Sequence, residues 1–362
     1  MNNRALRRAG QLGVVAAVGL AATLAGAAPA HAAPPPATAS IVDRTLTITG
    51  SNAPDDIVLS VGGANASLLL VDFGNDGTVD QQFDRSAFDA LNVSLGNGND
   101  RFAATGVTVP QSSTIDGGNG DDSIIGTGGA DFLKGGSGND ALTGGIGRDT
   151  AALDNGDDVF RWDNGDGSDD VDGGNGNDIM LFNGAGGNET MNLSAVGARA
   201  VFLRTQGNIV MNLDAVEQLD LHTFGGVDNL TVNDMSGSAL REANVDLSAS
   251  GTGVGSDGQP DVVTVSGTNR DDHVAVAGHG PQVDIAGLPI GVHLRGSSTA
   301  ELDRLQVNTL DGNDTVAVDP AALALIGVTT DLGAGQLCPA SEMGRSEVLL
   351  PISAERDIRS AS

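Results

Sequence analysis

A run of nine-residue blocks over residues 117–181 constrains the fold of this chain more than any other feature. Blocks such as GGNGDDSII and GGSGNDALT place glycine at the first, second and fourth positions, aspartate at the sixth and an apolar residue at the eighth. Glycine allows the positive φ angles and close backbone approach of a tight turn, and the last three residues alternate as in a short strand. The pattern therefore predicts short strands stacked through tight turns.

Seven blocks keep this phase, which a disordered acidic linker would not do. Their sixth-position aspartates are Asp122, Asp131, Asp140, Asp149, Asp158, Asp169 and Asp178. Their eighth-position apolar residues are Ile124, Leu133, Leu142, Ala151, Phe160, Val171 and Met180. The blocks at 153–161 and 164–172 depart from the glycine pattern, and two extra residues, Trp162 and Asp163, stand between them. We expect these two residues to bulge out at a turn.

The blocks also supply the donor atoms that a hard cation prefers. Each turn aims peptide carbonyls at one point, where the sixth-position carboxylate joins them, and such oxygen-only ligand sets favour Ca²⁺. The glycines expected to take part in these sites are Gly118, Gly120, Gly136, Gly138, Gly145, Gly147, Gly174 and Gly176. Together with the seven sixth-position aspartates, they form the predicted metal site.

Two successive blocks make one coil of about 18 residues, so alternate aspartates stack on the same side of a solenoid. One column contains Asp122, Asp140, Asp158 and Asp178, and the other contains Asp131, Asp149 and Asp169. With calcium held between neighbouring coils, this arrangement gives about five sites. Without metal the stacked carboxylates repel one another, so we expect the segment to fold on binding calcium.

The quoted blocks resemble the haemolysin-type (RTX) calcium-binding repeats of secreted bacterial proteins, over about a fifth of the chain. The resemblance implies an all-β fold with a parallel β-roll at 111–184, and Ca²⁺ bound by the sixth-position aspartates. It implies no particular activity, because such rolls accompany toxins, proteases, lipases, epimerases and adhesins. Many proteins of this kind leave the cell through an uncleaved C-terminal signal, whereas this chain has an N-terminal one.

Residues 1–32 have the features of a signal peptide. Three arginines precede an apolar run, and an Ala-His-Ala site ends it, so cleavage near Ala32 is expected. A membrane anchor is the alternative, but glycines and a proline interrupt the run. Residues 33–39 are expected to form a proline-rich linker. The sequence therefore predicts a secreted, extracellular protein with no membrane span.

The roll is expected to be flanked by further strand-turn coils. In the N-terminal β region, 40–110, strands are predicted at 44–49, 57–61 and 67–71, with a possible helical turn at 86–91. A solenoid-like β region, 185–335, contains a predicted hairpin of 200–204 with 209–213, and the shape of 50–57 returns at 267–274. Partial copies of the block occur at 95–103, 226–230 and 312–316. The tail, 336–362, breaks this composition, as either a truncated or frame-shifted array or a capping tail.

Composition limits the partners and the sources of stability. Removing residues 1–32 leaves 15 basic and 47 acidic residues, of which 40 are aspartate. This balance argues against nucleic acid or an anionic membrane as a partner, and a protein or glycan partner is left open. Cys338 is the only cysteine, so an exported chain of this size has no disulfide framework and metal is the expected substitute.

The sequence contains no recognisable catalytic motif. Neither HExxH nor GxSxG occurs, and the histidines after the signal, His222, His273, His279 and His293, have no metal-ligand spacing. The triplet at 271–273 could form an acid–base cluster, but the matching triplet at 55–57 has no histidine, which favours a turn role. We therefore expect no catalytic residue and no cofactor other than Ca²⁺.

Two functions are compatible with the sequence. The favoured one is a non-enzymatic, extracellular calcium-binding protein with a structural or surface-interaction role. The alternative is a polysaccharide-acting enzyme or adhesin module with its site on 182–330. A groove with clustered carboxylates and a histidine would favour the alternative, and a smooth coil face would favour the first.

Overall fold

The computed structural model describes residues 36–62, 66–104, 106–107 and 112–333, which belong to one compact unit. The expected signal peptide at 1–32, the first residues of the expected linker and the tail at 336–362 lie outside the described residues. The first strand begins at Thr38, inside the segment that was expected to be linker. No helix of the described residues is long and apolar enough to cross a membrane.

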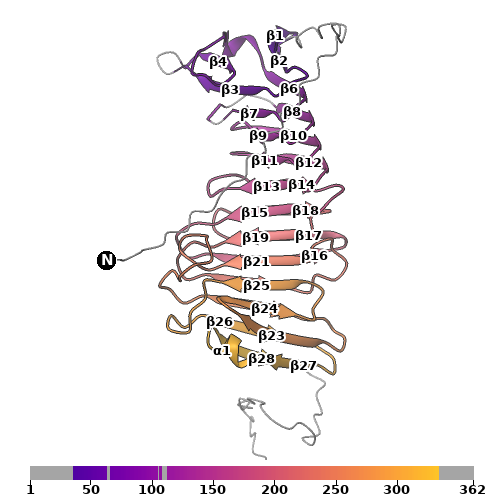
Figure 1. Cartoon of the computed structure of the whole chain (residues 1–362), viewed down its shortest axis with the longest axis vertical. Coiled ribbons are helices and arrows are strands. Elements are labelled where there is room, and N and C mark those ends of the chain that lie inside the picture. Colours follow the sequence, from indigo (N-terminus) through magenta and orange to yellow (C-terminus); the bar gives the residue numbers. More distant parts are fainter. Residues whose placement is uncertain (1–35, 63–65, 105, 108–111, 334–362) are drawn as a thin grey trace, which may run out of the picture. The chain divides into compact units, whose positions relative to one another are not determined.

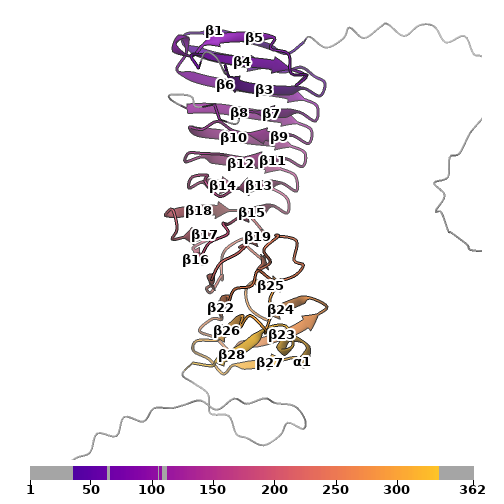
Figure 2. The ribbon, with the colours of Figure 1, turned by 90° about the vertical axis from the view of Figure 1, so that its left-hand side faces the viewer.

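The described chain forms two sheets, A and B, of 14 strands each (Figures 1 and 2). In spatial order, the strands of sheet A are β1 (Thr38–Val42), β2 (Thr45–Thr49), β6 (Ala90–Asn97), β8 (Ser112–Asn119), β10 (Ala130–Ser137), β12 (Thr150–Asn155), β14 (Asp170–Asp172), β18 (Ile209–Asp214), β17 (Arg199–Arg204), β16 (Thr190–Val196), β20 (Asn229–Val232), β22 (Val262–Ser266), β26 (Arg304–Asn308) and β28 (Gly327–Asp331). The strands of sheet B are β27 (Thr315–Val318), β23 (His273–His279), β24 (Gln282–Ala286), β25 (Gly291–Arg295), β21 (Glu242–Asp246), β19 (Gln218–His222), β15 (Ile179–Asn183), β13 (Val159–Trp162), β11 (Ala141–Thr143), β9 (Ser123–Ile125), β7 (Arg101–Ala103), β3 (Asp56–Val61), β4 (Leu68–Phe73) and β5 (Gln81–Asp84).

The predicted parallel β-roll is confirmed. From β6 to β15 successive strands alternate between the two sheets, and each pairs in parallel with the strands one coil away. Leu133 of β10 is paired with Ile115 on one side and Ala151 on the other, so one coil has the expected length of 18 residues. All seven eighth-position side chains are at most 2% exposed, because the alternation of these short strands turns them between the sheets.

The prediction for Trp162 was wrong. The two extra residues lengthen the coil to 20 residues, and Trp162 becomes the last residue of β13. Its side chain is 1% exposed and stacks on Phe182 of the next coil, with ring centroids 4.1 Å apart. The turn is made instead by the residues after Trp162, whose indole nitrogen donates to the carbonyl of Gly167 at 2.6 Å. Burying a large aromatic surface outweighs looping it out into water.

The flanking regions continue the same two sheets. At one end, parallel ladders join β2 to β6 and β6 to β8. At the other end, they join β20 to β22, β22 to β26 and β26 to β28. Three antiparallel insertions interrupt the coil pattern: β3 with β4 and β5, β16 with β17 and β18, and β23 with β24 and β25. The hairpin predicted at 200–204 and 209–213 is β17 with β18.

Helical structure is confined to two short segments of the described residues. A 3₁₀ turn, η1 (Arg85–Ala87), lies at the start of the predicted helical turn, with the Asp84 carboxylate accepting the Ser86 amide at 2.9 Å. The helix α1 (Pro320–Leu323) follows β27 and begins at the same kind of cap, Asp319 to Ala321 at 2.8 Å.

Candidate calcium sites

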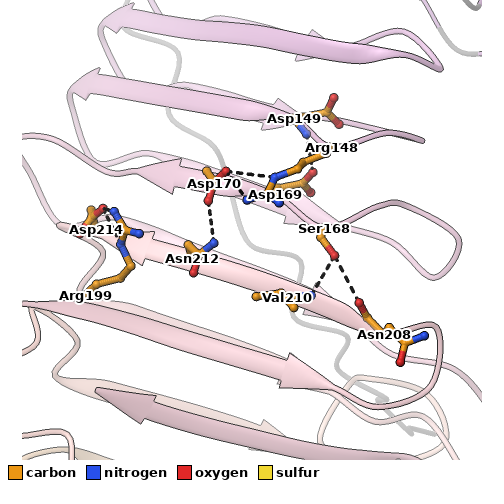
Figure 3. A network of polar contacts seen from close by, with 10 residues as sticks. All are labelled: Arg148, Asp149, Ser168, Asp169, Asp170, Arg199, Asn208, Val210, Asn212 and Asp214. Carbon is orange, nitrogen blue, oxygen red and sulfur yellow. Dashed lines mark hydrogen bonds and ion pairs between the residues drawn. The ribbon is translucent and has the colours of Figure 1, made fainter. Parts of the chain in front are cut away.

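The sixth-position aspartates form two buried columns, as the sequence predicted. Six of them immediately precede the first residue of a strand, and Asp131 is the second residue of its strand. All seven side chains are at most 4% exposed. In each column the backbone amide of one aspartate donates to Oδ1 of the aspartate in the following coil. These distances are 2.7 Å for Asp122 to Asp140, 2.6 Å for Asp140 to Asp158, 3.0 Å for Asp158 to Asp178, 2.8 Å for Asp131 to Asp149 and 2.9 Å for Asp149 to Asp169. Figure 3 shows Asp149 and Asp169 at the starts of neighbouring strands.

The second carboxylate oxygen has no such partner in most of the column. Six of the seven predicted aspartates have a buried Oδ2 without a hydrogen bond, namely Asp122, Asp140, Asp149, Asp158, Asp169 and Asp178. A buried carboxylate oxygen left unpaired costs on the order of 1–3 kcal/mol or more, so each such atom calls for a ligand. These oxygens recur once per coil, at the positions where the sequence predicted calcium.

Asp131 is the exception among the seven. Its Oδ2 accepts the amide of Thr127 at 2.6 Å and its Oδ1 accepts the Thr127 hydroxyl at 2.8 Å. Thr127 occupies the second position of its block, where the neighbouring blocks have glycine. The carboxylate of Asp131 is therefore satisfied within its own turn, and a cation would have to displace the Thr127 contacts.

The glycines of the blocks are required for space as well as for backbone conformation. The eight glycines predicted at the sites all have positive φ, between 90° and 156°. A Cβ on Gly136 would lie 2.1 Å from the carbonyl oxygen of Gly118, and one on Gly138 would lie 2.2 Å from that of Gly120. A Cβ on Gly135, a first-position residue, would lie 2.5 Å from Oδ2 of Asp140. The turn thus has carbonyl oxygens and a carboxylate in direct contact with glycine backbone.

Burial and mutual repulsion raise the pKa values of these aspartates. Loss of solvent is the larger cause, and the neighbouring carboxylates of the column add to it. The pKa is raised to about 6 for Asp122 and Asp178, to about 7 for Asp140 and Asp149, and to about 8 for Asp169. Near neutral pH the columns therefore bind protons that a cation has to replace.

The residues present fit Ca²⁺ well. The donors are carboxylate and peptide oxygens, with no sulfur or imidazole, which is the ligand chemistry of a hard cation. Within the described part of the chain, no three His, Cys, Asp or Glu side chains converge on one point. Side chains alone therefore do not complete a coordination shell, and a bound cation would also need peptide carbonyls of the turns, for which the sequence analysis named the glycines.

The first column extends beyond the predicted residues at both ends. The amide of Asp100 donates to Oδ1 of Asp122, and the amide of Asp55 donates to Oδ1 of Asp100, both at 2.8 Å. At the other end the amide of Asp178 donates to Oε2 of Glu217 at 2.9 Å. The partial block at 95–103 is a signal that could have identified Asp100, whereas nothing around Glu217 resembles a block.

The histidines lie apart from these columns. The expected turn role at 271–273 is confirmed, because Oδ2 of Asp272 accepts the Thr268 amide at 2.7 Å, as Oδ2 of Asp55 accepts the Ser51 amide at 2.6 Å. His279 and His293 both contact Asp284, at 2.7 Å and 2.6 Å. His222 contacts Asn183 at 2.9 Å.

The comparison with known families agrees with this geometry. The family model described as RTX calcium-binding nonapeptide repeat matches four copies, at residues 116–151 and 165–180. The chain carries haemolysin-type RTX repeats. The matched residues contain all the predicted aspartates except Asp158, which lies in the block that departs from the glycine pattern. Calcium is therefore the metal of the RTX turns.

The comparisons with curated sequences and with solved structures do not indicate an activity. No curated protein sequence matches the chain. Among solved structures, the extracellular lipase LipA from Serratia marcescens is similar over 54% of this chain and 44% of its own, at 17% identity and a TM-score of 0.19. The chain thus spans less than half the length of that lipase structure, and the likeness supports no statement about activity.

The raised pKa values predict how pH acts on the calcium-free protein. The folded columns hold protons that the unfolded chain, with aspartate pKa values near 3.9, has lost at neutral pH. The stronger proton binding of the folded state adds to the free energy of unfolding. This added stability is fully present below about pH 4 and is lost as pH rises through the folded pKa values of about 6 to 8.

Thermal unfolding followed by circular dichroism without calcium should therefore give a higher Tm at pH 5 than at pH 8. In saturating Ca²⁺ the order should reverse, because protons compete with the cation for the same oxygens. A calcium-free Tm that rises from pH 5 to pH 8 would contradict these pKa shifts.

Proposed function

We propose that this protein is an extracellular, calcium-dependent structural protein whose RTX roll folds when Ca²⁺ binds between its coils. The observation that carries the proposal is the unpaired, buried Oδ2 atom that recurs coil after coil. Bound Ca²⁺ would supply the positive charge that these columns lack. The chain's own contribution is to stack the carboxylates through the amide-to-Oδ1 bonds and to leave room for carbonyl oxygens at the glycines.

The energetic scale supports folding on binding. Extracellular calcium modules bind with Kd of roughly 10⁻⁴–10⁻³ M, so millimolar calcium adds about 0.4–1.4 kcal/mol per site by mass action. About five sites then contribute roughly 2–7 kcal/mol, which is comparable with the total stability of a typical domain. Such sites fill at millimolar calcium, the range of the extracellular medium, which agrees with the signal peptide expected at 1–32.

The proposal assigns no catalysis to the roll. Its turns are built from carboxylates, glycines and amides whose spacing serves cation binding, and the outward strand positions beside them pair into surface contacts. In Figure 3, Arg148 contacts Asp170 at 3.0 Å and Arg199 contacts Asp214 at 2.6 Å on the outer face of sheet A. Exposed ion pairs of this kind add about 0–1 kcal/mol each and are typical of a solvated surface.

One feature favours the alternative function. A groove of about 220 Å³ on sheet B is lined by residues of β19, β21 and β25 and by the loop residues Gly251 and Thr252. Asp220, Asn244 and His293 are in register across three neighbouring strands there. The polar residues that line the groove are Asp220, His222, Asn244, Asp246, Thr252, His293 and Arg295. A groove with clustered carboxylates and a histidine is the feature that the sequence analysis took to favour a polysaccharide-acting enzyme or adhesin module with its site on 182–330.

Calcium dependence of the whole chain tests the main proposal. In chelator at pH 8, circular dichroism should lose the part of the β signal that the RTX roll contributes, and this signal should return as calcium is added. Asp140→Asn removes a ligand from two gaps between coils, so the calcium midpoint should rise roughly tenfold, equivalent to about 1.4 kcal/mol. Asp172→Asn, at an exposed position of β14, is the matched control and should leave the midpoint unchanged. Identical circular dichroism spectra with chelator and with calcium would contradict the proposal.

A glycan-binding screen in millimolar calcium tests the groove. If the groove binds a polysaccharide, the Asp220→Ala/His293→Ala double variant should lose at least about tenfold in affinity for any glycan that binds, corresponding to about 1.4 kcal/mol. The exposed Asp311→Asn substitution serves as the control. Absence of binding, or binding that the double variant retains, would remove this alternative.

A further inference from the structure

A third column of buried carboxylates lies outside the matched repeats. Glu189, Asp228, Asp261 and Asp303 each immediately precede a strand of sheet A, namely β16, β20, β22 and β26. All four are at most 2% exposed. Each amide donates to the carboxylate of the next member, at 2.8 Å from Glu189 to Asp228 and 2.9 Å for both of the following steps. This is the geometry of the RTX columns, built without a nonapeptide.

The two ends of this column are satisfied by the protein. The Glu189 carboxylate accepts the Arg204 guanidinium on Oε1 and the Ala185 amide, at 3.1 Å, on Oε2. Oδ2 of Asp303 accepts the Ser298 amide at 2.7 Å. Neither terminal carboxylate therefore has an oxygen in need of another ligand.

The two middle members are not satisfied. Asp228 is 2% exposed and Asp261 is 1% exposed, and their Oδ2 atoms have no hydrogen bond. Both atoms repeat the unpaired oxygens of the RTX turns in neighbouring coils. An unpaired buried carboxylate oxygen is costly, and two in succession on one column point to a missing cation.

Two further acids reach into the same turns. Oδ2 of Asp257 accepts the amide of Gly226 at 3.0 Å, in the turn that leads to Asp228. Oε1 of Glu301 accepts the Ser256 hydroxyl at 2.5 Å, in the turn that leads to Asp261, while Oε2 of Glu301 is buried with no hydrogen bond. Each of these side chains thus crosses from its own turn to the turn of a neighbouring coil.

No basic side chain that the structure describes offsets the negative charge that these five acids would carry when ionised. Loss of solvent and the neighbouring carboxylates raise the pKa of Asp228 to about 7 and that of Asp261 to about 8. The charge of Asp257 contributes to both shifts, and Glu301 acts in the same direction on Asp303. Among the described residues, none of the five forms an ion pair with a basic side chain.

The acidic turn cluster is the set of Asp228, Asp257, Asp261, Glu301 and Asp303. We propose that its turns hold a calcium site separate from the RTX repeats, with the unpaired Oδ2 atoms of Asp228 and Asp261 as its side-chain ligands and peptide carbonyls of the turns as the remaining donors. The donors would be carboxylate and peptide oxygens, which suit the variable geometry of Ca²⁺ better than the strict octahedron of Mg²⁺. The site is independent of the proposed function, because it does not require the RTX roll to fold on calcium. It would fix the β20–β22–β26 coils in the same way as the repeats fix theirs.

The site escapes a search for nonapeptides because of its spacing. Members of the column are 39, 33 and 42 residues apart, whereas members of the RTX columns are 18 to 20 apart. The longer coils contain the β16–β18 and β23–β25 insertions and a long loop before β22. The four residues still stack in a column because the parallel pairing of the strands that follow them, and not a fixed sequence period, aligns them.

Counting bound calcium in the full-length protein tests the site. Equilibrium dialysis against saturating Ca²⁺, with metal and protein quantified, should give one ion fewer for Asp261→Asn than for the wild type. The amide keeps the Oδ1 acceptor for Asp228, so the column should remain stacked. Asp311→Asn, exposed and in the same region, should keep the wild-type count. An unchanged count for Asp261→Asn overturns the proposal.

A stability measurement separates a calcium ligand from a merely structural residue. Without calcium, Asp261→Asn should unfold at the same or a higher temperature than the wild type, because a buried charge is removed. In calcium it should gain less than the wild type does. The milder substitution Glu301→Gln should lower the affinity for one calcium ion about tenfold without altering the calcium-free Tm. If both variants gain as much from calcium as the wild type, the cluster is a set of protonated carboxylates and no metal site.

Failure of this site and failure of the RTX proposal can be told apart. Asp149→Asn lies in the repeats and should shift the main calcium-dependent change in circular dichroism, which Asp261→Asn should leave in place. A protein that needs no calcium to fold but loses one ion in Asp261→Asn would contradict only the folding role of the repeats. A protein that folds on calcium and loses no ion in Asp261→Asn would contradict only this site.

Discussion

One hydrogen bond, from the amide of an acidic residue to the carboxylate of its counterpart one coil away, organises this structure. It aligns Asp122 with Asp140 and Asp149 with Asp169, and it recurs from Asp228 to Asp261. The bond uses one oxygen of each carboxylate and leaves the other buried. The stack is therefore built around oxygens that need a cation, and the proposed coupling of folding to metal binding rests on this feature.

The sequence period was sufficient to predict the roll because nearly every element of it is local. Glycine permits the turn, the eighth residue faces inward, and two blocks close a coil, so the columns and the burial of Leu133 or Phe160 follow directly. The same reasoning failed for Trp162. Two added residues were interpreted as a bulge, but only Asp163 lies in the turn. Trp162 extends β13 and stacks on Phe182, because burial of an aromatic surface decided the outcome.

The acidic turn cluster could not be predicted from the sequence. Asp228 belongs to a partial copy of the block and was noticed, but Asp261 and Asp303 stand in turns with no recognisable pattern. They join the column only because insertions of whole hairpins leave the parallel ladder intact. Non-local strand pairing, which no window of sequence contains, therefore places these carboxylates together, and the same holds for Glu217 beneath Asp178.

The most direct test of the account is to locate calcium in the folded protein. A crystal grown in millimolar Ca²⁺ and measured for anomalous scattering should show peaks between successive turns of the columns, next to Oδ2 of Asp140, Asp158 and Asp149. Protein oxygens should surround each peak at roughly 2.3–2.6 Å. An ordered structure from the same crystals, with no anomalous peak beside these carboxylates, would contradict the central claim that they are calcium ligands.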